Sequence, residues 1–130
     1  MHKNSVRMVT MLILSILIGL NVSCASAPKP VPEDASALKI IQMAQERYDA
    51  YDLDGAKYYY QVLLERYGSD PAYRLNAMYE IAFIEYKRGN TKAAIEGFRA
   101  VRARYEEPDG AQLPQTWKTL AEKMLSKLGS

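Results

Sequence analysis

Apolar residues recur every three or four positions from residue 35 to the C-terminus. This spacing places them on one face of a helix, whereas a strand alternates apolar and polar residues at every second position. The first apolar stripe ends at Tyr51, and the third consists of Leu75, Met78, Ile81, Ala82 and Tyr86. The pattern predicts an all-α fold with helices over residues 35–51, 54–67, 71–88, 92–106 and 114–128.

Start and stop signals stand where the apolar pattern is interrupted. Asp70-Pro71 places a side-chain acceptor at an N-cap and a proline at the first helical position. Gly89 suits the end of one helix, and Asn90 or Thr91 can cap the next one. These local signals support the predicted helix boundaries.

The turn after the first predicted helix, residues 49–55, contains three aspartates and resembles a fragment of a calcium-binding loop. That motif requires an acid at its first position and a glutamate at its twelfth. The residues at those positions here are Ala50 and Gln61. We therefore expect no metal site, and a turn in which Asp52 or Asp54 serves as a cap.

A shift that moves Ala44 onto Ala82 aligns the chain with itself and indicates an internal repeat. Small residues fall on small ones and large residues on large ones, as packed helix pairs require. The other pairs aligned by the same shift are Tyr48 and Tyr86, Ala56 and Ala94, Tyr60 and Phe98, and Leu63 and Val101.

These positions resemble the tetratricopeptide repeat (TPR) family, most closely the divergent repeats of envelope proteins. The family's repeat is shorter than this one, at about 34 residues. Tyr51 stands in place of the first turn glycine, and Glu85 in place of a usual tyrosine. The resemblance implies an α-solenoid of two helix pairs plus a C-terminal capping helix over residues 35–130. The alternative is a five-helix bundle that forms no solenoid. The residues that carry it are Met43, Ala44, Ala56, Tyr60, Leu63, Met78, Ile81, Ala82, Gly89, Ala94, Phe98, Val101, Trp117, Leu120 and Ala121.

In this family the first helix of each pair lines a concave groove. Aromatic residues with polar tips on such a face suit an extended partner segment, whereas the alternative is that they pack against the neighbouring helix. The implied groove positions are Ile41, Gln45, Tyr48, Asp49, Tyr79, Phe83, Tyr86, Lys87, Lys118, Glu122 and Leu125. The resemblance singles out Tyr48, Tyr79, Phe83, Tyr86 and Lys87 as the partner-binding residues.

The N-terminal segment has the features of an export signal. Residues 1–23 contain a basic start and the uncharged apolar run Met8–Gly19, and they end before Cys24. The preceding residues resemble a bacterial lipoprotein box, loosely, because Asn21 replaces the usual aliphatic residue. The resemblance implies a lipid-anchored Cys24 followed by a Pro-rich linker to residue 34. A plain cleaved signal and an uncleaved membrane anchor are the alternatives.

The residue after the cysteine, Ala25, is compatible with sorting to the outer membrane, on its periplasmic side. A proline-rich linker favours extended backbone, so residues 25–34 are expected to act as a spacer that lifts the domain off the membrane. The expected location is therefore the bacterial cell envelope, with the protein held at the membrane.

Composition excludes several functional classes. The chain has 17 Lys and Arg, 15 Asp and Glu, one Cys and one His. Signal cleavage would remove Lys3, Arg7 and the only histidine, His2, and leave the side-chain charges balanced. This inventory argues against a metal site, nucleophilic catalysis and nucleic-acid binding, so we expect neither an enzyme nor a cofactor.

The expected function is a lipid-anchored interaction module that binds an envelope protein or peptide, within an assembly or transport complex. The alternative is an accessory component of a transport system that binds a small molecule or a lipid. Two repeats and a cap are near the lower limit for stable stacking. Either a partner or a second copy of the chain, in a homo-oligomer, could complete the stack.

Overall fold

The computed structural model describes residues 27–130, and every regular element in that part of the chain is helical. The all-α prediction is confirmed, and each α-helix begins and ends within three residues of its predicted bounds. The elements are α2 (Ala37–Asp49), α3 (Leu53–Tyr67), α4 (Pro71–Lys87), α5 (Thr91–Ala103), the 3₁₀ helices η1 (Arg104–Glu106) and η2 (Gly110–Gln112), and α6 (Gln115–Lys127).

Side-chain caps explain where three of the helices begin. The side chains of Ser36, Asp52 and Asp70 accept backbone N–H groups in the first turns of α2, α3 and α4. Of the two acids considered for the first turn, Asp52 is the cap, at 2.9 Å from the Gly55 nitrogen. Pro71 follows Asp70 at the first helical position, as predicted, where its missing N–H costs no helical hydrogen bond.

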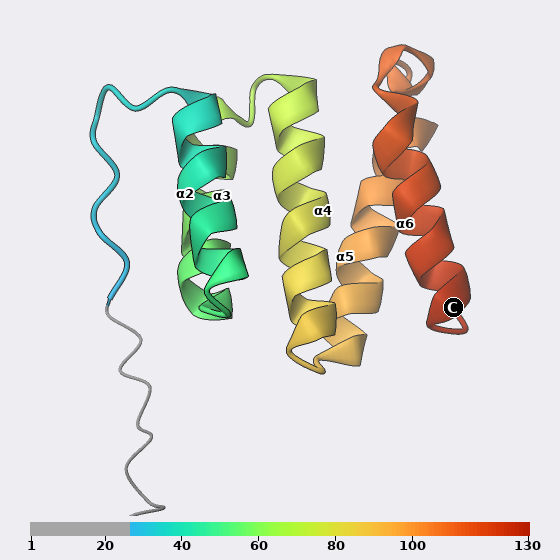
Figure 1. Cartoon of the computed structure of the whole chain (residues 1–130). Coiled ribbons are helices and arrows are strands. Elements are labelled where there is room, and N and C mark those ends of the chain that lie inside the picture. The colour runs from blue at the N-terminus through green and yellow to red at the C-terminus, as the bar shows by residue number, and fades with distance from the viewer. Residues whose placement is uncertain (1–26) are drawn as a thin grey trace, which may run out of the picture.

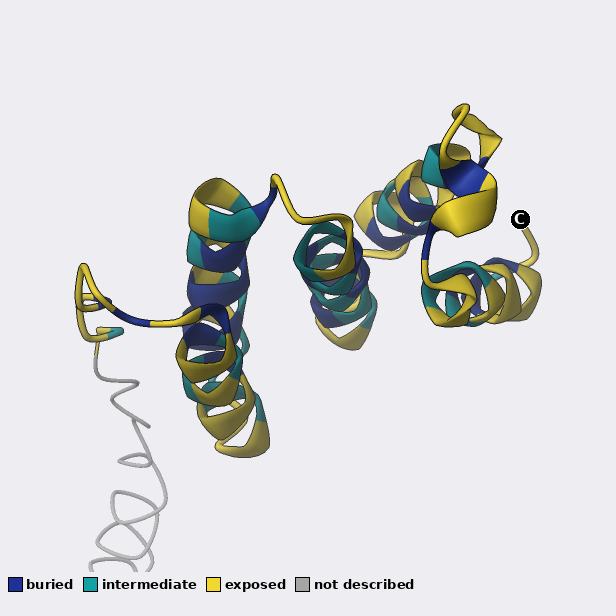
Figure 2. Cartoon of the chain, turned by 90° about the horizontal axis from the view of Figure 1, so that it is seen from above, coloured by how far each residue is buried: buried dark blue, intermediate teal, exposed yellow. Residues whose placement is uncertain are grey.

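The helices stand side by side in chain order, each packed against the one before it (Figure 1). Contacts join α2 to α3, α3 to α4, α4 to α5 and α5 to α6, and α4 also touches α6. Seen from above, buried residues lie where neighbouring helices face one another, and exposed residues lie on the outer sides (Figure 2). Helix α4 therefore contacts α3 as well as α5 and α6.

This position of α4 divides the core into two clusters. Ala77 and Ile84 pack with α2 and α3 in the first cluster. Leu75, Tyr79 and Ala82 pack with α5 and α6 in the second cluster. The single apolar stripe predicted for this helix is therefore incomplete, because it omits Ala77 and Ile84. It also combines two faces, since its member Ile81 packs against the first cluster.

A close approach between α4 and α5 depends on Gly97. A Cβ atom at this position would lie 2.6 Å from the Cβ of Ala82. That distance is far below an ordinary van der Waals contact, so a larger residue would force the two helices apart. Two small residues facing each other thus set the spacing of this helix pair.

Tyr51 does not belong to the apolar stripe in which the sequence placed it. Helix α2 ends at Asp49, and the Tyr51 side chain is 88% exposed. Its φ angle is 59°, in the left-handed region that few residues other than glycine adopt. The position of Tyr51 is therefore set by the geometry of the turn and not by burial of its ring.

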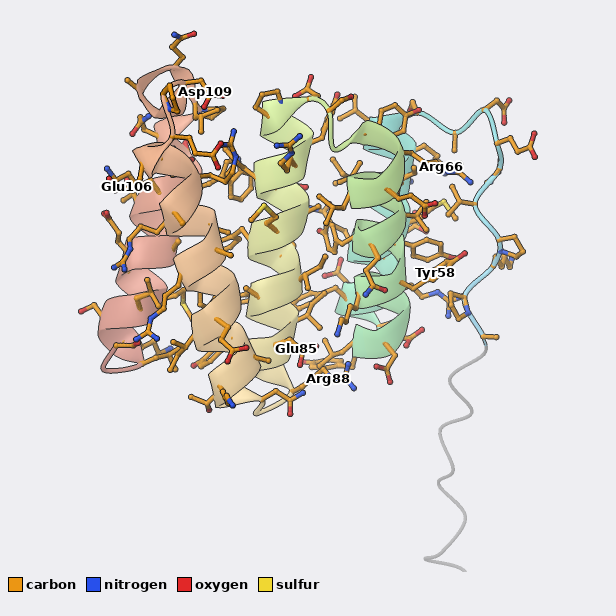
Figure 3. The ribbon with its side chains drawn as sticks, turned by 180° about the vertical axis from the view of Figure 1, so that it is seen from behind. Tyr58, Arg66, Glu85, Arg88, Glu106 and Asp109 are labelled. Carbon is orange, nitrogen blue, oxygen red and sulfur yellow. The ribbon has the colours of Figure 1, made fainter. Side chains whose placement is uncertain are left out.

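The Pro-rich linker packs along α3. Val31 is buried in the first core cluster, and the Tyr59 hydroxyl donates to the Lys29 carbonyl at 2.9 Å. The Arg66 guanidinium donates to the carbonyls of Val31 and Pro32 at 3.1 and 2.6 Å, on the side of α3 that faces the linker (Figure 3). The packed part of the chain therefore begins ahead of residue 35, and residues 29–34 are no free spacer.

The expected signal peptide, residues 1–23, and the expected lipidation site, Cys24, lie outside the described residues. Within residues 27–130, no helix has both the length and the apolar character needed to cross a membrane.

Candidate binding site

An aromatic row runs across α2, α4 and α6. The ring centroids of Tyr48 and Phe83 are 6.4 Å apart, and those of Phe83 and Tyr86 are 5.8 Å apart. Tyr79 stacks on Phe83 at 6.1 Å and reaches Trp117 at 5.5 Å. The structure thus brings together the four aromatic side chains that the sequence selected as partner-binding residues.

Burial divides this row into core and surface members. Tyr79 is only 8% exposed and packs its ring on Phe98 at 5.4 Å. Leu125, another expected groove residue, is also buried in the second core cluster. The side chains of Tyr79 and Leu125 therefore pack against neighbouring helices, which was the alternative to binding a partner. Tyr48, Phe83 and Tyr86 remain half-buried.

Tyr86 already has a neighbour of its own. The Nζ atom of Lys127, on α6, lies 5.0 Å from the centre of the Tyr86 ring, within the range of a cation–π contact. The ammonium group lowers the pKa of the Tyr86 hydroxyl, mainly through a hydrogen bond. Tyr86 therefore helps to join α6 to α4.

A pocket of about 360 Å³ opens beside Tyr48 and Phe83. It draws residues from three helices, and its walls combine aromatic rings, an amide and two carboxylates. The lining residues are Gln45, Tyr48 and Asp49 of α2, Tyr60 of α3, and Glu80 and Phe83 of α4.

The pocket combines a poorly solvated acid, Glu80, with an exposed one, Asp49. Burial raises the pKa of the Glu80 carboxyl. The pKa of Tyr60 is also raised, first by burial and then by the negative charges of Glu80 and Asp49. Within residues 27–130, no Lys or Arg nitrogen lies within 4 Å of either carboxylate.

A second hollow of about 310 Å³ adjoins this pocket and shares Tyr48 and Asp49 with it. Tyr51, Leu53 and Lys87 complete its lining. Lys87, a predicted partner-binding residue, therefore lies near the two rings but in the neighbouring hollow. The two hollows thus meet at Tyr48 and Asp49, near the C-terminal end of α2.

The two pocket residues that the sequence missed are Tyr60 and Glu80. Tyr60 is one of the residues aligned by the internal repeat, and it is 2% exposed, yet it lines the wall of the pocket. Glu80 precedes Phe83 by three positions, which places both side chains on the same face of a helix. That spacing was the available signal for Glu80.

Glu85 has a different role. Its carboxylate lies 2.6 Å from the Lys57 ammonium and accepts the Asn90 side-chain amide at 2.5 Å. These hydrogen bonds lower its pKa, and Arg88 links Glu85 to Asp54 at 3.8 and 2.8 Å. Glu85 and Arg88 lie at the C-terminal end of α4, at the lower edge of the view in Figure 3. The network ties α3 to α4 and to the start of α5.

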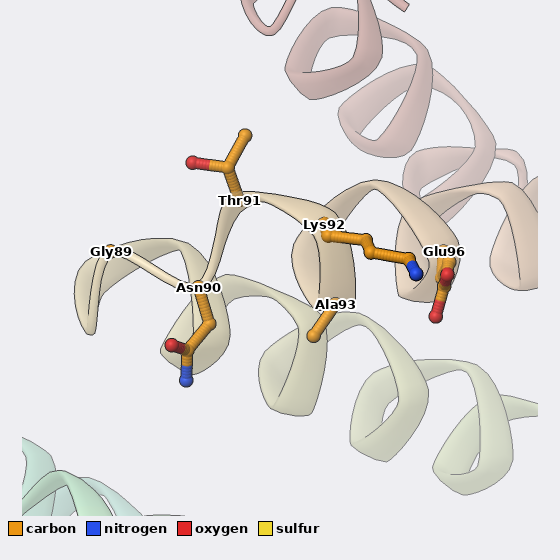
Figure 4. A pocket seen from close by; sticks show the side chains of 6 residues that line it. All are labelled: Gly89, Asn90, Thr91, Lys92, Ala93 and Glu96. Atoms are coloured by element: carbon orange, nitrogen blue, oxygen red, sulfur yellow. The ribbon is translucent and has the colours of Figure 1, made fainter.

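A further hollow of about 570 Å³ surrounds the turn between α4 and α5. All of its lining residues come from that turn and the first part of α5, between positions 89 and 96 (Figure 4). All of them are exposed, and none is aromatic. It is an open surface beside one helix terminus, so it provides no convergent set of groups for a ligand.

No cluster of three or more His, Cys, Asp or Glu side chains positioned for a metal ion occurs in residues 27–130. The residues that line the pocket beside Tyr48 provide hydrogen-bond acceptors, aromatic ring faces and carboxylates. This chemistry suits binding of a group that is apolar along its length and cationic at its tip.

The chain is similar to an uncharacterized protein of Treponema pallidum (strain Nichols), with 31% identity over 108 residues. The matched segment takes in 82% of this chain and spans 43% of the relative's length. No protein-family model matches the chain. No solved structure matches it either.

Proposed function

We propose that this chain is a lipid-anchored interaction module of a bacterial cell envelope. In this proposal, two TPR-like helix pairs hold an extended protein or peptide segment at the pocket between α2 and α4. The observation that carries the proposal is that the pocket is lined by the first helix of each pair, with Tyr48 and Phe83 both half-buried beside it.

The repeat supports the TPR-like part of the proposal. Positions related by the repeat shift share their burial as well as their size: Ala44 and Ala82, Ala56 and Ala94, Tyr60 and Phe98, and Leu63 and Val101 are all at most 2% exposed. Small residues at matched seams allow the helices of a pair to approach closely. A common pattern of burial is expected if α2–α3 and α4–α5 are copies of one unit.

The packed linker gives the anchored form a defined geometry. If Cys24 carries the acyl chains, only residues 25–28 lie between it and Lys29, whose carbonyl is bound by Tyr59. Those residues can extend by about 3.4 Å each at most. The α3 side of the domain would then lie close to the membrane surface. The proposed location is the periplasmic side of the outer membrane.

Site-specific photocrosslinking tests the interaction proposal. A photoreactive phenylalanine analogue at Phe83 should capture one defined protein in cells, and Tyr48→Ala should abolish this product. The same analogue at Tyr58, which is exposed on α3, serves as the control. Equal products from both positions, or none from Phe83, would contradict the proposal.

Metabolic labelling tests the anchor separately. Cells that express the full chain and are fed a clickable palmitate analogue should label the wild-type protein and leave Cys24→Ala unlabelled. Labelling that persists in Cys24→Ala, or is absent from both, would exclude lipidation at this residue and leave the interaction proposal unaffected.

A further inference from the structure

We infer that the pocket beside Tyr48 and Phe83 binds a lysine or arginine side chain from an extended segment of the partner protein. This inference rests on the proposed function, because it specifies which side chain the interaction module recognises. It follows from three features of the pocket: its unpaired carboxylates, its ring faces and its continuity with the neighbouring hollow.

The carboxylates point to a cation. Asp49 and Glu80 come from different helices and line the same pocket, and no Lys or Arg of residues 27–130 pairs with either of them. Some other acids in this part of the chain are ion-paired, such as Asp52 with Arg47 at 3.0 Å and Glu85 with Lys57 at 2.6 Å, whereas exposed acids such as Glu96 are not. Asp49 and Glu80 differ from those exposed acids because they share one pocket, in which Glu80 is poorly solvated.

The poor solvation of Glu80 makes an entering cation favourable. Burial raises the pKa of its carboxyl, so the ionised form is disfavoured in the free protein. An ammonium or guanidinium group in the pocket would stabilise the negative charge of the Glu80 carboxylate, which bulk water solvates poorly. The strength of such a contact therefore depends on Glu80 more than on an exposed acid of the same charge.

The rings favour a cation carried on an aliphatic stem. Tyr48 and Phe83 flank the pocket with centroids 6.4 Å apart, and their faces attract cations as well as methylene groups. A pocket of about 360 Å³ also lies at the small end of ligand-site volumes, which run from about 300 to 1,000 Å³. These dimensions suit one long side chain.

Continuity with the second hollow favours a polypeptide as the source of that side chain. The surface that holds Tyr51, Leu53 and Lys87 begins where the pocket ends, at Tyr48 and Asp49. It provides room for the residues that flank the bound one. The positive charge of Lys87 disfavours a second basic residue there, so the expected segment carries one isolated Lys or Arg.

The test is an NMR titration of the full chain in detergent micelles with blocked pentapeptides of the form Ala-Ala-Xaa-Ala-Ala. The Lys and Arg peptides should bind at least fivefold more tightly than the norleucine peptide, which keeps the stem and lacks the charge. Chemical-shift changes should centre on Tyr48 and Phe83. Glu80→Gln should reduce the preference for Lys over norleucine at least fivefold.

Controls make the result specific to the pocket. Asp49→Asn should also weaken binding of the Lys peptide, whereas Glu46→Gln should not, because Glu46 is exposed on α2 and hydrogen-bonds Gln42 outside the pocket. Equal binding of the Lys and norleucine peptides would overturn the inference. Tighter binding of putrescine than of the Lys peptide would overturn the assignment to a protein segment.

The two proposals fail in distinguishable ways. If the protein captured at Phe83 is still captured by Glu80→Gln with unchanged yield, the interaction module stands and the basic-side-chain inference is wrong. If the Lys peptide binds in a Glu80-dependent manner but Phe83 captures nothing in cells, the pocket chemistry stands and the proposed function is wrong.

Discussion

Tyr51 and Gly89 occupy the corresponding turns of the two helix pairs, and both have left-handed backbones, with φ angles of 59° and 80°. Glycine adopts this conformation without steric cost, whereas other residues bring their Cβ too close to a carbonyl oxygen. The 88% exposure of Tyr51 leaves little packing to offset that cost. The first turn therefore keeps the geometry of the second with a residue poorly suited to it.

Substitutions at Tyr51 and Gly89 should change the free energy of unfolding in opposite directions. Relief of the left-handed strain in Tyr51→Gly is worth about 1–2 kcal/mol, and the greater freedom of glycine in the unfolded chain offsets part of it. The net gain should be about 0.5–1 kcal/mol, whereas Gly89→Ala should lose about 1 kcal/mol. Urea unfolding measures both. A loss of stability in Tyr51→Gly would show that the tyrosine side chain stabilises the turn by contacts.

Glu85 should stabilise the fold in a pH-dependent way. Its pKa is lowered in the folded state, chiefly by the hydrogen bonds from Lys57 and Asn90. Its contribution is therefore present above its ordinary pKa of 4.5 and is lost as pH falls through the folded pKa. Glu85→Gln should cost about 2 kcal/mol at pH 7, and the difference from wild type should shrink below pH 4.5.

Denaturant unfolding across this pH range measures the Glu85 effect. Glu96→Gln, at an exposed position on α5, is the control and should stay within about 0.5 kcal/mol of wild type at every pH. A Glu85→Gln cost that is the same at pH 7 and pH 3.5 would contradict an electrostatic origin.

Glu80 should have the opposite effect from Glu85 on the pH dependence of stability. Because burial raises its folded pKa, its carboxyl favours the folded state when protonated, and stability falls as pH rises through that pKa. Glu80→Gln should therefore be more stable than wild type at pH 7, and this advantage should vanish below the ordinary value of 4.5. Thermal unfolding at both pH values measures the difference. A Glu80→Gln protein that is less stable at pH 7 would indicate that the carboxylate has a stabilising partner.

The packing of the linker predicts a stability effect far from the helices. Val31 is 7% exposed, so Val31→Ala should cost about 1–2 kcal/mol through the loss of two buried carbons. Glu33→Ala, at an exposed position in the same segment, should have little effect. Urea unfolding of the full-length variants compares them. Equal stability of both variants would show that the segment does not contribute to the fold.

Local sequence signals determined the helices and most of their boundaries. A cap such as Asp70-Pro71, a turn glycine such as Gly89 and an apolar residue every three or four positions act over less than two helical turns. The correspondence of Ala44 with Ala82 under one fixed shift was also evident, because equivalent packing requires residues of equal size. These features need no knowledge of which helix lies beside which.

Tertiary structure alone decided which faces became surface. Tyr79 and Phe83 are one turn apart on α4, yet Tyr79 is covered by α5 and α6 whereas Phe83 borders the pocket. The linker is likewise part of the core, because Val31 packs in the cluster that contains residues of α3. The pocket itself combines Tyr60 and Glu80, which lie on separate helices. Burial and unpaired charge arise from the juxtaposition of helices distant in sequence, and a local pattern carries no information about that juxtaposition.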